Sequence, residues 1–162
     1  MIIRKAGYSD VLVIHQLANL IWWPTYRDIL PDEQIHFMLS DMYSEEALRS
    51  QMDCGYYFLI AERENIPVGF AAYSLTEPEN KVYKLQKLYI LPSEQGKRTG
   101  KKLVDEVIRL AAEQQGEILE LNVNRRNKAF HFYEKAGFEI YQEVDIPYND
   151  FVLNDYVMRK KI

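Results

Sequence analysis

Apolar residues along the chain repeat at helical spacing in some segments and at strand spacing in others, and turn-forming residues separate the segments. After Ser9-Asp10, a candidate helix cap, apolar residues recur every three or four positions as far as Ile21, which predicts a helix ending near Trp22-Trp23-Pro24. The stretch from Pro24 to Met52 is rich in helix formers and is interrupted at Pro31. It predicts one or two further helices.

The rest of the chain alternates between strand-like and helix-like patterns. Strands are predicted over residues 2–5, 57–62, 67–74, 82–91, 118–123, 138–145 and 152–160, and helices over residues 101–114 and 128–136. The expected order of elements is β-α-α-β-β-β-α-β-α-β-β. This order predicts an α/β (α+β) fold in which a mixed central sheet of six to seven strands carries helices on both faces.

Length and charge limit the domain organisation and the kind of partner. A chain of 162 residues with 48% hydrophobic residues fits a single domain over residues 1–162, and no repeat or linker divides it. The formal net charge is −4, from 20 basic and 24 acidic residues. Nucleic acid is disfavoured as a partner because domains that bind it usually carry a basic excess. A mildly acidic surface tolerates cationic substrates such as amines.

Cysteine, histidine and the N-terminal residues limit the setting of the protein. Cys54 is the single cysteine, which excludes an intramolecular disulfide and a cysteine-rich metal site and makes a reducing, cytoplasmic compartment the expected one. The three histidines are isolated, so we expect no metal site. The N-terminus lacks the apolar core of a signal peptide and no apolar run approaches a membrane span, so no membrane partner is expected.

The run Gln95-Gly96-Lys97-Arg98-Thr99-Gly100-Lys101 lies between a predicted strand and a predicted helix. A strand that turns through small residues into a helix directs several backbone N–H groups and a partial positive charge at one point, which favours phosphate binding. A Walker A loop is excluded because Gly96 and Gly100 are four positions apart and no Ser or Thr follows Lys101, and a Rossmann fingerprint needs three spaced glycines. The run predicts an anion site; the alternative is an ordinary surface loop that begins a helix.

A second run, Asn127 to Phe138, reads Asn-Lys-Ala-Phe-His-Phe-Tyr-Glu-Lys-Ala-Gly-Phe. Together with Leu88-Tyr89-Ile90-Leu91-Pro92 and Gln95-x-x-Arg98-x-Gly100, it resembles the GNAT superfamily of N-acetyltransferases. The resemblance covers the whole chain in the order of its elements and the C-terminal half in its motifs. It implies the GNAT fold and direct transfer of an acetyl group from acetyl-CoA to an amine.

The resemblance also implies where acetyl-CoA binds. Backbone N–H groups from Gly96 to Lys101 hold the pyrophosphate, and the strand from Leu88 to Ile90 splays away from the strand from Leu119 to Val123 to admit the pantetheine arm. An N–H group near Ile90 polarises the thioester carbonyl. The implied cofactor-binding residues are Leu88, Tyr89, Ile90, Gln95, Gly96, Lys97, Arg98, Thr99, Gly100, Lys101, Asn122, Asn127 and Tyr133.

Two residues of the second run have an alternative structural role. Tyr133 occupies the family position of the general acid that protonates the leaving sulfur, and the alternative is a plain core aromatic between Phe132 and Phe138. Asn127 is placed by the motif to hydrogen-bond the cofactor arm, and the alternative is a helix N-cap. One side chain can serve both roles.

Two positions depart from the family pattern. Arg98 stands where the pattern has glycine, which costs about 1–2 kcal/mol if the position requires a positive φ and otherwise adds a guanidinium that can grip a phosphate. Gln86 stands where some relatives have a glutamate, and an amide cannot take the proton of the amine. The remaining candidates for that proton are a water or one of the following residues: Glu77, Glu33, Asp28, Asp145, Tyr89 and His36.

The resemblance places the acceptor between the N-terminal helices and the last hairpin. Aromatic residues there can form a wall that favours a cation; the candidate acceptor-binding residues are Trp22, Trp23, Tyr26, Glu77, Tyr148 and Tyr156. The Trp-Trp-Pro-Thr-Tyr segment is similar to GNAT members grouped with polyamine acetyltransferases, which favours a small polyamine-like amine. The alternatives are a protein or peptide amine, a different acyl group selected near Tyr89 and Phe70, and a CoA-binding module without turnover. The resemblance also allows a homodimer.

Overall fold

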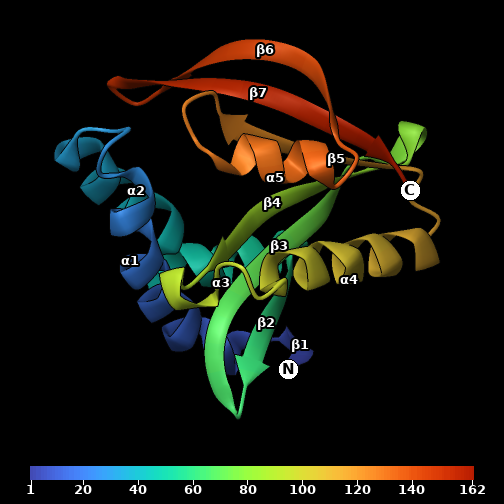
Figure 1. Cartoon of the computed structure of the whole chain (residues 1–162), viewed down its shortest axis with the longest axis horizontal. Helices are drawn as coiled ribbons and strands as arrows, with labels where there is room; N and C mark the ends of the chain where they lie inside the picture. Colours follow the sequence, from blue (N-terminus) through green and yellow to red (C-terminus); the bar gives the residue numbers. More distant parts are fainter.

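The computed structural model describes all residues from Met1 to Ile162 as one seven-stranded sheet with helices packed on it. The strands are β1 (Ile2–Ala6), β2 (Tyr57–Arg63), β3 (Ile66–Glu77), β4 (Val82–Ile90), β5 (Ile118–Asn124), β6 (Glu139–Tyr148) and β7 (Phe151–Lys161). Their order across the sheet is β1-β2-β3-β4-β5-β7-β6, and only the β4–β5 pair is parallel. The predicted mixed sheet is confirmed, and Figure 1 shows the β6–β7 hairpin reaching beyond the other strands.

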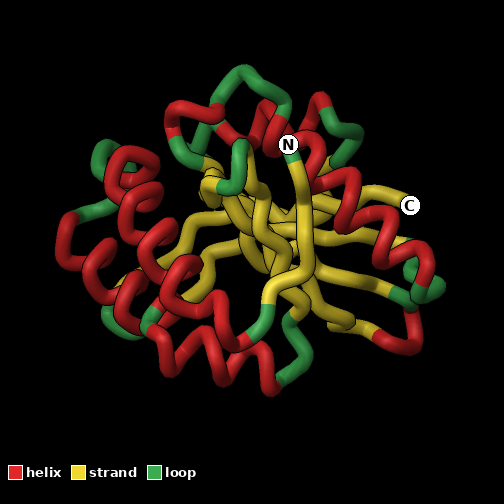
Figure 2. Tube along the Cα trace, turned by 90° about the horizontal axis from the view of Figure 1, so that it is seen from below, coloured by secondary structure: helices red, strands yellow, loops and turns green.

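Helices cover both faces of this sheet (Figure 2). They are α1 (Val11–Tyr26), α2 (Asp32–Tyr43), α3 (Glu45–Asp53), α4 (Thr99–Glu113) and α5 (Ala129–Lys135). One buried cluster joins the sheet to α4 and α5, and a second joins the opposite face to α1, α2 and α3. We refer to these as the α4/α5 face and the α1–α3 face. Successive residues of the central strands are buried in different clusters, because neighbouring side chains of a strand point to opposite faces of the sheet.

The first helix does not end near Pro24 as the sequence predicted. Helix α1 continues to Tyr26 although proline removes one backbone N–H donor. The Thr25 hydroxyl donates to the Ile21 carbonyl at 2.7 Å. Buried rings hold the last turn in place, since Trp22 and Tyr26 have centroids 4.4 Å apart. Tertiary packing of these two aromatic side chains therefore outweighs the local cost of proline.

The stretch after Pro31 forms two helices, at the upper limit of the prediction. Ser44 separates them, because its side chain accepts a hydrogen bond from the Ala47 N–H at 3.1 Å and so caps α3. The order of elements thus has one more helix than the order derived from the sequence. No helix is both long enough and apolar enough to cross a membrane.

Strand β4 carries a bulge in its middle. Leu85 pairs with Tyr73 of β3 and Lys87 pairs with Ala72, so Gln86 is an extra residue. The bulge changes which face the next residues occupy: Leu85 belongs to the α4/α5 cluster, whereas Lys87 lies over the Tyr43 ring of α2. Without the bulge, Leu85 and Lys87 would share a face.

Strand β4 also separates from β5. Their parallel pairing runs from Val82 opposite Ile118 to Leu85 opposite Leu121 and goes no further. On its other edge, β4 stays paired with β3 as far as Ile90 opposite Gly69. The segment from Leu88 to Ile90 therefore has a gap on the β5 side, as the resemblance implied.

Candidate active site

The loop between β4 and α4 presents backbone N–H groups that no backbone carbonyl accepts. These are the N–H groups of Gly96, Arg98, Thr99, Gly100 and Lys101. The first turn of an α-helix leaves its donors free, and the helix macrodipole adds a partial positive charge there. Converging free donors with positive potential are what a pyrophosphate requires, so the loop fits the predicted anion site.

Arg98 has a left-handed backbone at the start of α4, with φ 64° and ψ 14°. The position is therefore one that favours glycine, and a side chain there costs about 1–2 kcal/mol. Gly96, two residues earlier, also has a positive φ, of 81°. The Arg98 side chain is exposed, and no carboxylate of the chain forms an ion pair with it. Arginine is thus a strained substitute for glycine whose guanidinium stays free to meet a phosphate.

Glu94 holds this loop in place, and the sequence analysis missed it. Its carboxylate, 3% exposed, accepts a hydrogen bond from the Thr99 hydroxyl at 2.7 Å and from Arg63 Nη2 at 3.0 Å. The Arg63 guanidinium, followed by the Thr99 hydroxyl, lowers the pKa of Glu94 to about 2. Because the Thr99 side chain is fully buried in this contact, only its backbone N–H remains for a ligand. A single glutamate in a loop carries no pattern from which this role could be read.

Side chains from the two faces of the sheet meet where β4 and β5 part. Tyr133 of α5 belongs to the α4/α5 cluster, and Tyr26 of α1 belongs to the opposite one. Burial, and then the proximity of Tyr26, raise the pKa of Tyr133. The Tyr26 hydroxyl lies 3.0 Å from the Tyr89 hydroxyl of β4. The gap in the sheet thus brings three of the predicted site residues to one place.

Tyr133 has the packing of a core aromatic, and its role as general acid stays a prediction. It packs edge-to-face on Phe132 and Phe138, with ring centroids 5.3 and 5.8 Å away, so it is a core aromatic. Tyr133 is also near enough to Tyr26, a residue of the opposite cluster, for Tyr26 to contribute to its raised pKa. A raised phenol pKa keeps the proton on oxygen at neutral pH, which leaves a donor in a dry setting.

The asparagines of the predicted site lie at the end of β5. Asn127 Oδ1 accepts a hydrogen bond from the Ala129 N–H at 2.9 Å, at the start of α5. Its side chain also lies within hydrogen-bonding reach of the Tyr26 hydroxyl. Asn122 Nδ2 donates to Asp155 Oδ2 of β7 at 3.4 Å. Burial raises the pKa of Asp155, a buried acid that the sequence analysis did not consider.

The predicted acceptor residues do not all come together. Tyr26 lies at the gap, and Trp23 packs on His36 of α2 with ring centroids 4.7 Å apart. Tyr148, at the tip of the β6–β7 hairpin, donates a hydrogen bond to Asp41 of α2, so the hairpin reaches the N-terminal helices. Glu77 lies opposite Val82 at the far end of β4 and forms an ion pair with Arg159 at 3.0 Å. The structure therefore separates Glu77 from the other acceptor candidates.

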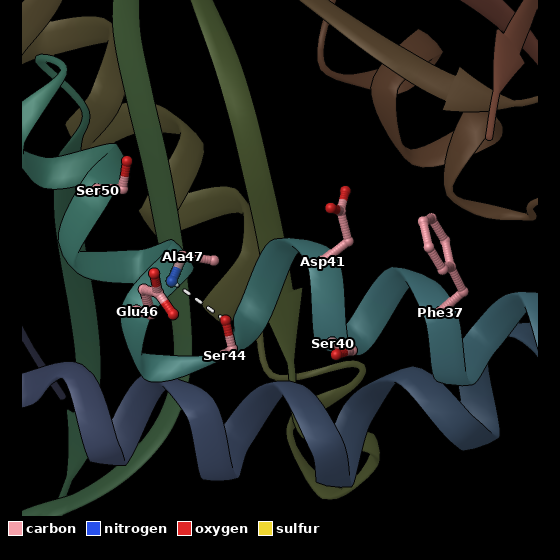
Figure 3. A pocket seen from close by; sticks show the side chains of 7 residues that line it. All are labelled: Phe37, Ser40, Asp41, Ser44, Glu46, Ala47 and Ser50. Atoms are coloured by element: carbon pink, nitrogen blue, oxygen red, sulfur yellow. Dashed lines mark hydrogen bonds between the residues drawn. The ribbon is translucent and has the colours of Figure 1, made fainter.

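A groove runs along α2 and α3 beside the Tyr148 contact. Its lining is acidic and polar (Figure 3), and comprises Phe37, Ser40, Asp41, Ser44, Glu46, Ala47 and Ser50. Figure 3 shows the side chains of Phe37 and Asp41 pointing away from α1. Phe37 also packs on Tyr148, with ring centroids 5.6 Å apart. The groove lining thus carries two carboxylates and no basic residue, and Phe37 connects it to Tyr148.

The residues predicted to deprotonate the amine are poorly placed for it. Asp145 is exposed and pairs with Arg125 at 2.7 Å; hydrogen bonds from Asn154 and Arg125 lower its pKa. Glu77 is held by Arg159. Burial raises the pKa of Tyr89 well above its usual value. The others are exposed residues: Asp28, Glu33 and His36.

Comparison with known proteins identifies the family. A family model described as the acetyltransferase (GNAT) domain matches residues 27–153. The chain belongs to the GNAT acetyltransferase family. It is accordingly an acetyl-CoA-dependent N-acetyltransferase, and the gap and free N–H donors described above fit acetyl-CoA as its cosubstrate. A search of curated protein sequences finds no match.

Solved structures agree with the GNAT assignment. The PaiA N-acetyltransferase of Thermoplasma acidophilum, solved in complex with coenzyme A, is 28% identical, with 99% of this chain and 98% of that one covered and a TM-score of 0.85. A GCN5-related N-acetyltransferase of Rhodopseudomonas palustris is 25% identical, with 99% and 95% covered and a TM-score of 0.83. The ribosomal-protein-S18-alanine N-acetyltransferase of Escherichia coli, 17% identical with 99% and 93% covered, shares the fold with a TM-score of 0.75.

Proposed function

We propose that this GNAT protein transfers the acetyl group of acetyl-CoA to a primary amine of a small, polyamine-like molecule. The observation that carries the proposal is the gap between β4 and β5, which opens beside five free N–H donors and is reached by side chains from both faces of the sheet. A cosubstrate can enter it from the α4/α5 face, and an acceptor can approach from the α1–α3 face.

The cofactor side of the proposal uses mainly backbone groups. The free N–H groups of Gly96, Arg98, Thr99, Gly100 and Lys101 hold the pyrophosphate, whereas the Lys97 N–H is bonded to the Glu94 carbonyl. The Arg98 guanidinium and the exposed Lys101 ammonium, which pairs with Asp105 at 2.6 Å, lie on the same loop as cations for the phosphates. The unpaired edge from Leu88 to Ile90 binds the pantetheine amides much as a neighbouring strand would, and an N–H near Ile90 polarises the thioester carbonyl. Asn127, whose side chain also lies within reach of the Tyr26 hydroxyl, offers its amide NH₂ to the same arm.

The chemical step is direct attack. The neutral amine forms a C–N bond with the thioester carbon, the C–S bond breaks, and the thiolate leaves. Tyr133 donates its proton to the departing sulfur and regains one from the nitrogen. Because a buried phenol is a weak acid, part of its benefit is the hydrogen bond that it gives to the developing negative charge.

The acidic groove supports a polyamine-like acceptor. Asp41 and Glu46 give the surface beside the aromatic wall a negative charge, and a flexible diamine can place one ammonium there while its other end reaches the gap. Trp23, Tyr26 and Tyr148 provide aromatic surface for the aliphatic or cationic parts of such a molecule.

Two measurements test this function. Acetyl-CoA and CoA are expected to raise the melting temperature, whereas ATP is not, since a ligand stabilises the state that binds it by about 2.7 kcal/mol at 100 times its Kd. Thiol release from acetyl-CoA is expected with spermidine or 1,4-diaminobutane and to a lesser degree with a peptide N-terminus. A CoA-induced shift without thiol release for any amine would instead identify a CoA-binding module.

A further inference from the structure

Lys87 of β4 is buried without a charged partner. Its side chain is 6% exposed, and its Nζ lies 4.1 Å from the centroid of the Tyr43 ring. No carboxylate lies within ion-pair distance of it, although lysines are almost never buried to this degree unless they are paired. Burial lowers the pKa of Lys87 to about 7. Near neutral pH, much of the population therefore carries a lone pair on Nζ.

The bulge at Gln86 gives Lys87 its orientation. It turns Lys87 to the α1–α3 face, which Tyr89 also occupies through its contacts with Trp22 and Tyr43. This is the face from which the proposed acceptor approaches, and Lys87 lies between the last residue paired with β5 and the unpaired segment from Leu88 to Ile90. Gln86 is occupied with the Ser74 hydroxyl at 3.2 Å, and its amide cannot take up a proton.

The groups around Lys87 do not oppose a neutral amine. Tyr43 of α2, Tyr26 of α1 and Tyr89 of β4 all have pKa values raised chiefly by burial, so they remain uncharged. Strand β3 presents Ala72 opposite Lys87. The carboxylates of the neighbouring elements are engaged elsewhere, as follows: Asp155 with Asn122, Asp41 with Tyr148, and Glu77 and Glu120 with Arg159. Lys84, also on β4, is half-buried and its charge acts on Asp155.

We propose that Lys87 Nζ takes the proton from the acceptor ammonium, an inference that rests on the acetyl transfer proposed above. The R–NH₃⁺ group gives one proton to the Nζ lone pair, which yields R–NH₂ and a Lys87 ammonium. The freed lone pair of R–NH₂ attacks the thioester carbon, the second nitrogen proton passes to the thiolate through Tyr133, and Lys87 then releases its proton to water. The products are the amide, CoA thiol and one proton.

A titration of the unmodified protein tests this without any acceptor. The ¹³Cε chemical shift of Lys87, assigned by the loss of its signal in Lys87→Met, is expected to titrate with a midpoint near pH 7, well below that of an exposed lysine such as Lys81. A midpoint above pH 9 would overturn the proposal, because a lysine that is always charged cannot accept a proton at neutral pH.

Kinetics with 1,4-diaminobutane provide the second test. At pH 7.5, Lys87→Met and Lys87→Arg are both expected to lose on the order of 100-fold in kcat, since neither side chain accepts a proton in this range. The deficit should shrink toward pH 10 as the diamine deprotonates in solution. Lys81→Met, at the exposed end preceding β4, is the control that should keep the wild-type pH profile. If Lys87→Arg stays active, or if Asp155→Asn rather than Lys87→Met removes the pH dependence, Lys87 is not the proton acceptor.

Failure of this inference is distinguishable from failure of the proposed function. If Lys87 is not the proton acceptor, the CoA-induced stabilisation and thiol release of the wild-type protein remain. If the proposed function fails, the wild-type protein itself shows no thiol release. Each Lys87 variant is therefore first measured for its CoA-induced shift in melting temperature, which is expected to match that of the wild type.

Discussion

The two faces of the sheet build their parts of the site in different ways. On the α4/α5 face, the proposed phosphate loop consists of nearly consecutive residues with free backbone N–H groups, and hydrogen bonds to the Glu94 carboxylate hold it in place. On the α1–α3 face, side chains from α1, α2, β4 and the β6–β7 hairpin meet only in the folded molecule. The proposed cofactor site thus uses one contiguous stretch of the chain, whereas the proposed acceptor site depends on how distant elements pack.

The largest effect on turnover is expected from Tyr133, which lies where β4 and β5 part. Tyr133→Phe removes the hydroxyl at the gap but keeps the ring packed on Phe132 and Phe138. We expect kcat to fall on the order of 100-fold while the CoA-induced thermal shift stays within error, because only the proton donor is lost. Steady-state kinetics from pH 6 to 10 provide the measurement. Unchanged turnover across this range would show that Tyr133 is only a core residue.

Loss of the Glu94 carboxylate, which holds the loop between β4 and α4, is expected to lower the affinity for CoA but not for the acceptor. Glu94→Gln removes a charged hydrogen-bond acceptor from Arg63 and Thr99 and should lower the free energy of unfolding by about 2 kcal/mol. The CoA affinity should also fall, because the N–H groups of the loop lose their fixed arrangement. Urea unfolding and CoA titration measure the two quantities. Glu117→Gln, which breaks only the exposed pair with Lys81, is the control and should stay within about 0.5 kcal/mol.

The same anchor predicts a pH dependence. The pKa of Glu94 is about 2 in the folded protein against an ordinary value of 4.5, so its contribution to stability is fully present above pH 4.5 and is lost as the pH falls toward 2. The wild-type free energy of unfolding should therefore fall more steeply than that of Glu94→Gln between pH 4.5 and 2. Parallel curves for the two proteins in this window would contradict the role of Glu94.

Neutralising the acidic groove is expected to change the KM for the acceptor but not the affinity for CoA. The double variant Asp41→Asn with Glu46→Gln should raise KM for 1,4-diaminobutane about fivefold, as two exposed charge interactions of about 0.5 kcal/mol each predict. A monoamine such as butylamine is the matched control, and its KM should change little because it has no second ammonium. Equal changes for the two substrates would mean that the groove does not bind the far end of the acceptor.

The smallest effect is expected at Arg98. Arg98→Gly relieves the left-handed strain and should raise the free energy of unfolding without ligand by about 1 kcal/mol. Arg98→Ala keeps the left-handed strain but loses the guanidinium. Comparing the two variants therefore separates the effect of backbone strain from the effect of the guanidinium charge. If the guanidinium grips a phosphate, both variants show a smaller CoA-induced shift, whereas only the glycine variant is more stable without ligand. Equal stability of the two variants would remove the strain argument.

The features that could be predicted from the sequence are those that depend on residues close together in the chain. The succession of strands along the chain, the loop before α4 and the start of α5 after Asn127 follow from local apolar spacing, small residues and helix signals, which act over one or two turns. The helix end near Pro24 was predicted wrongly because packing of Trp22 and Tyr26 overrides the local effect of proline. Glu94, Asp155 and Lys87 escaped prediction since their roles depend on burial and on partners far away in the chain.

The sequence by itself determined the family, the sheet with its two helical layers and the position of the loop between β4 and α4, because these depend on spacing within short segments. Only the tertiary structure decided the left-handed backbone of Arg98, the separation of Glu77 from the acceptor residues, and the position of Lys87. For Lys87 the physical reason is one irregularity of β4. A single extra residue at the bulge reverses which face the following side chains occupy, and no composition or periodicity of the sequence records that reversal.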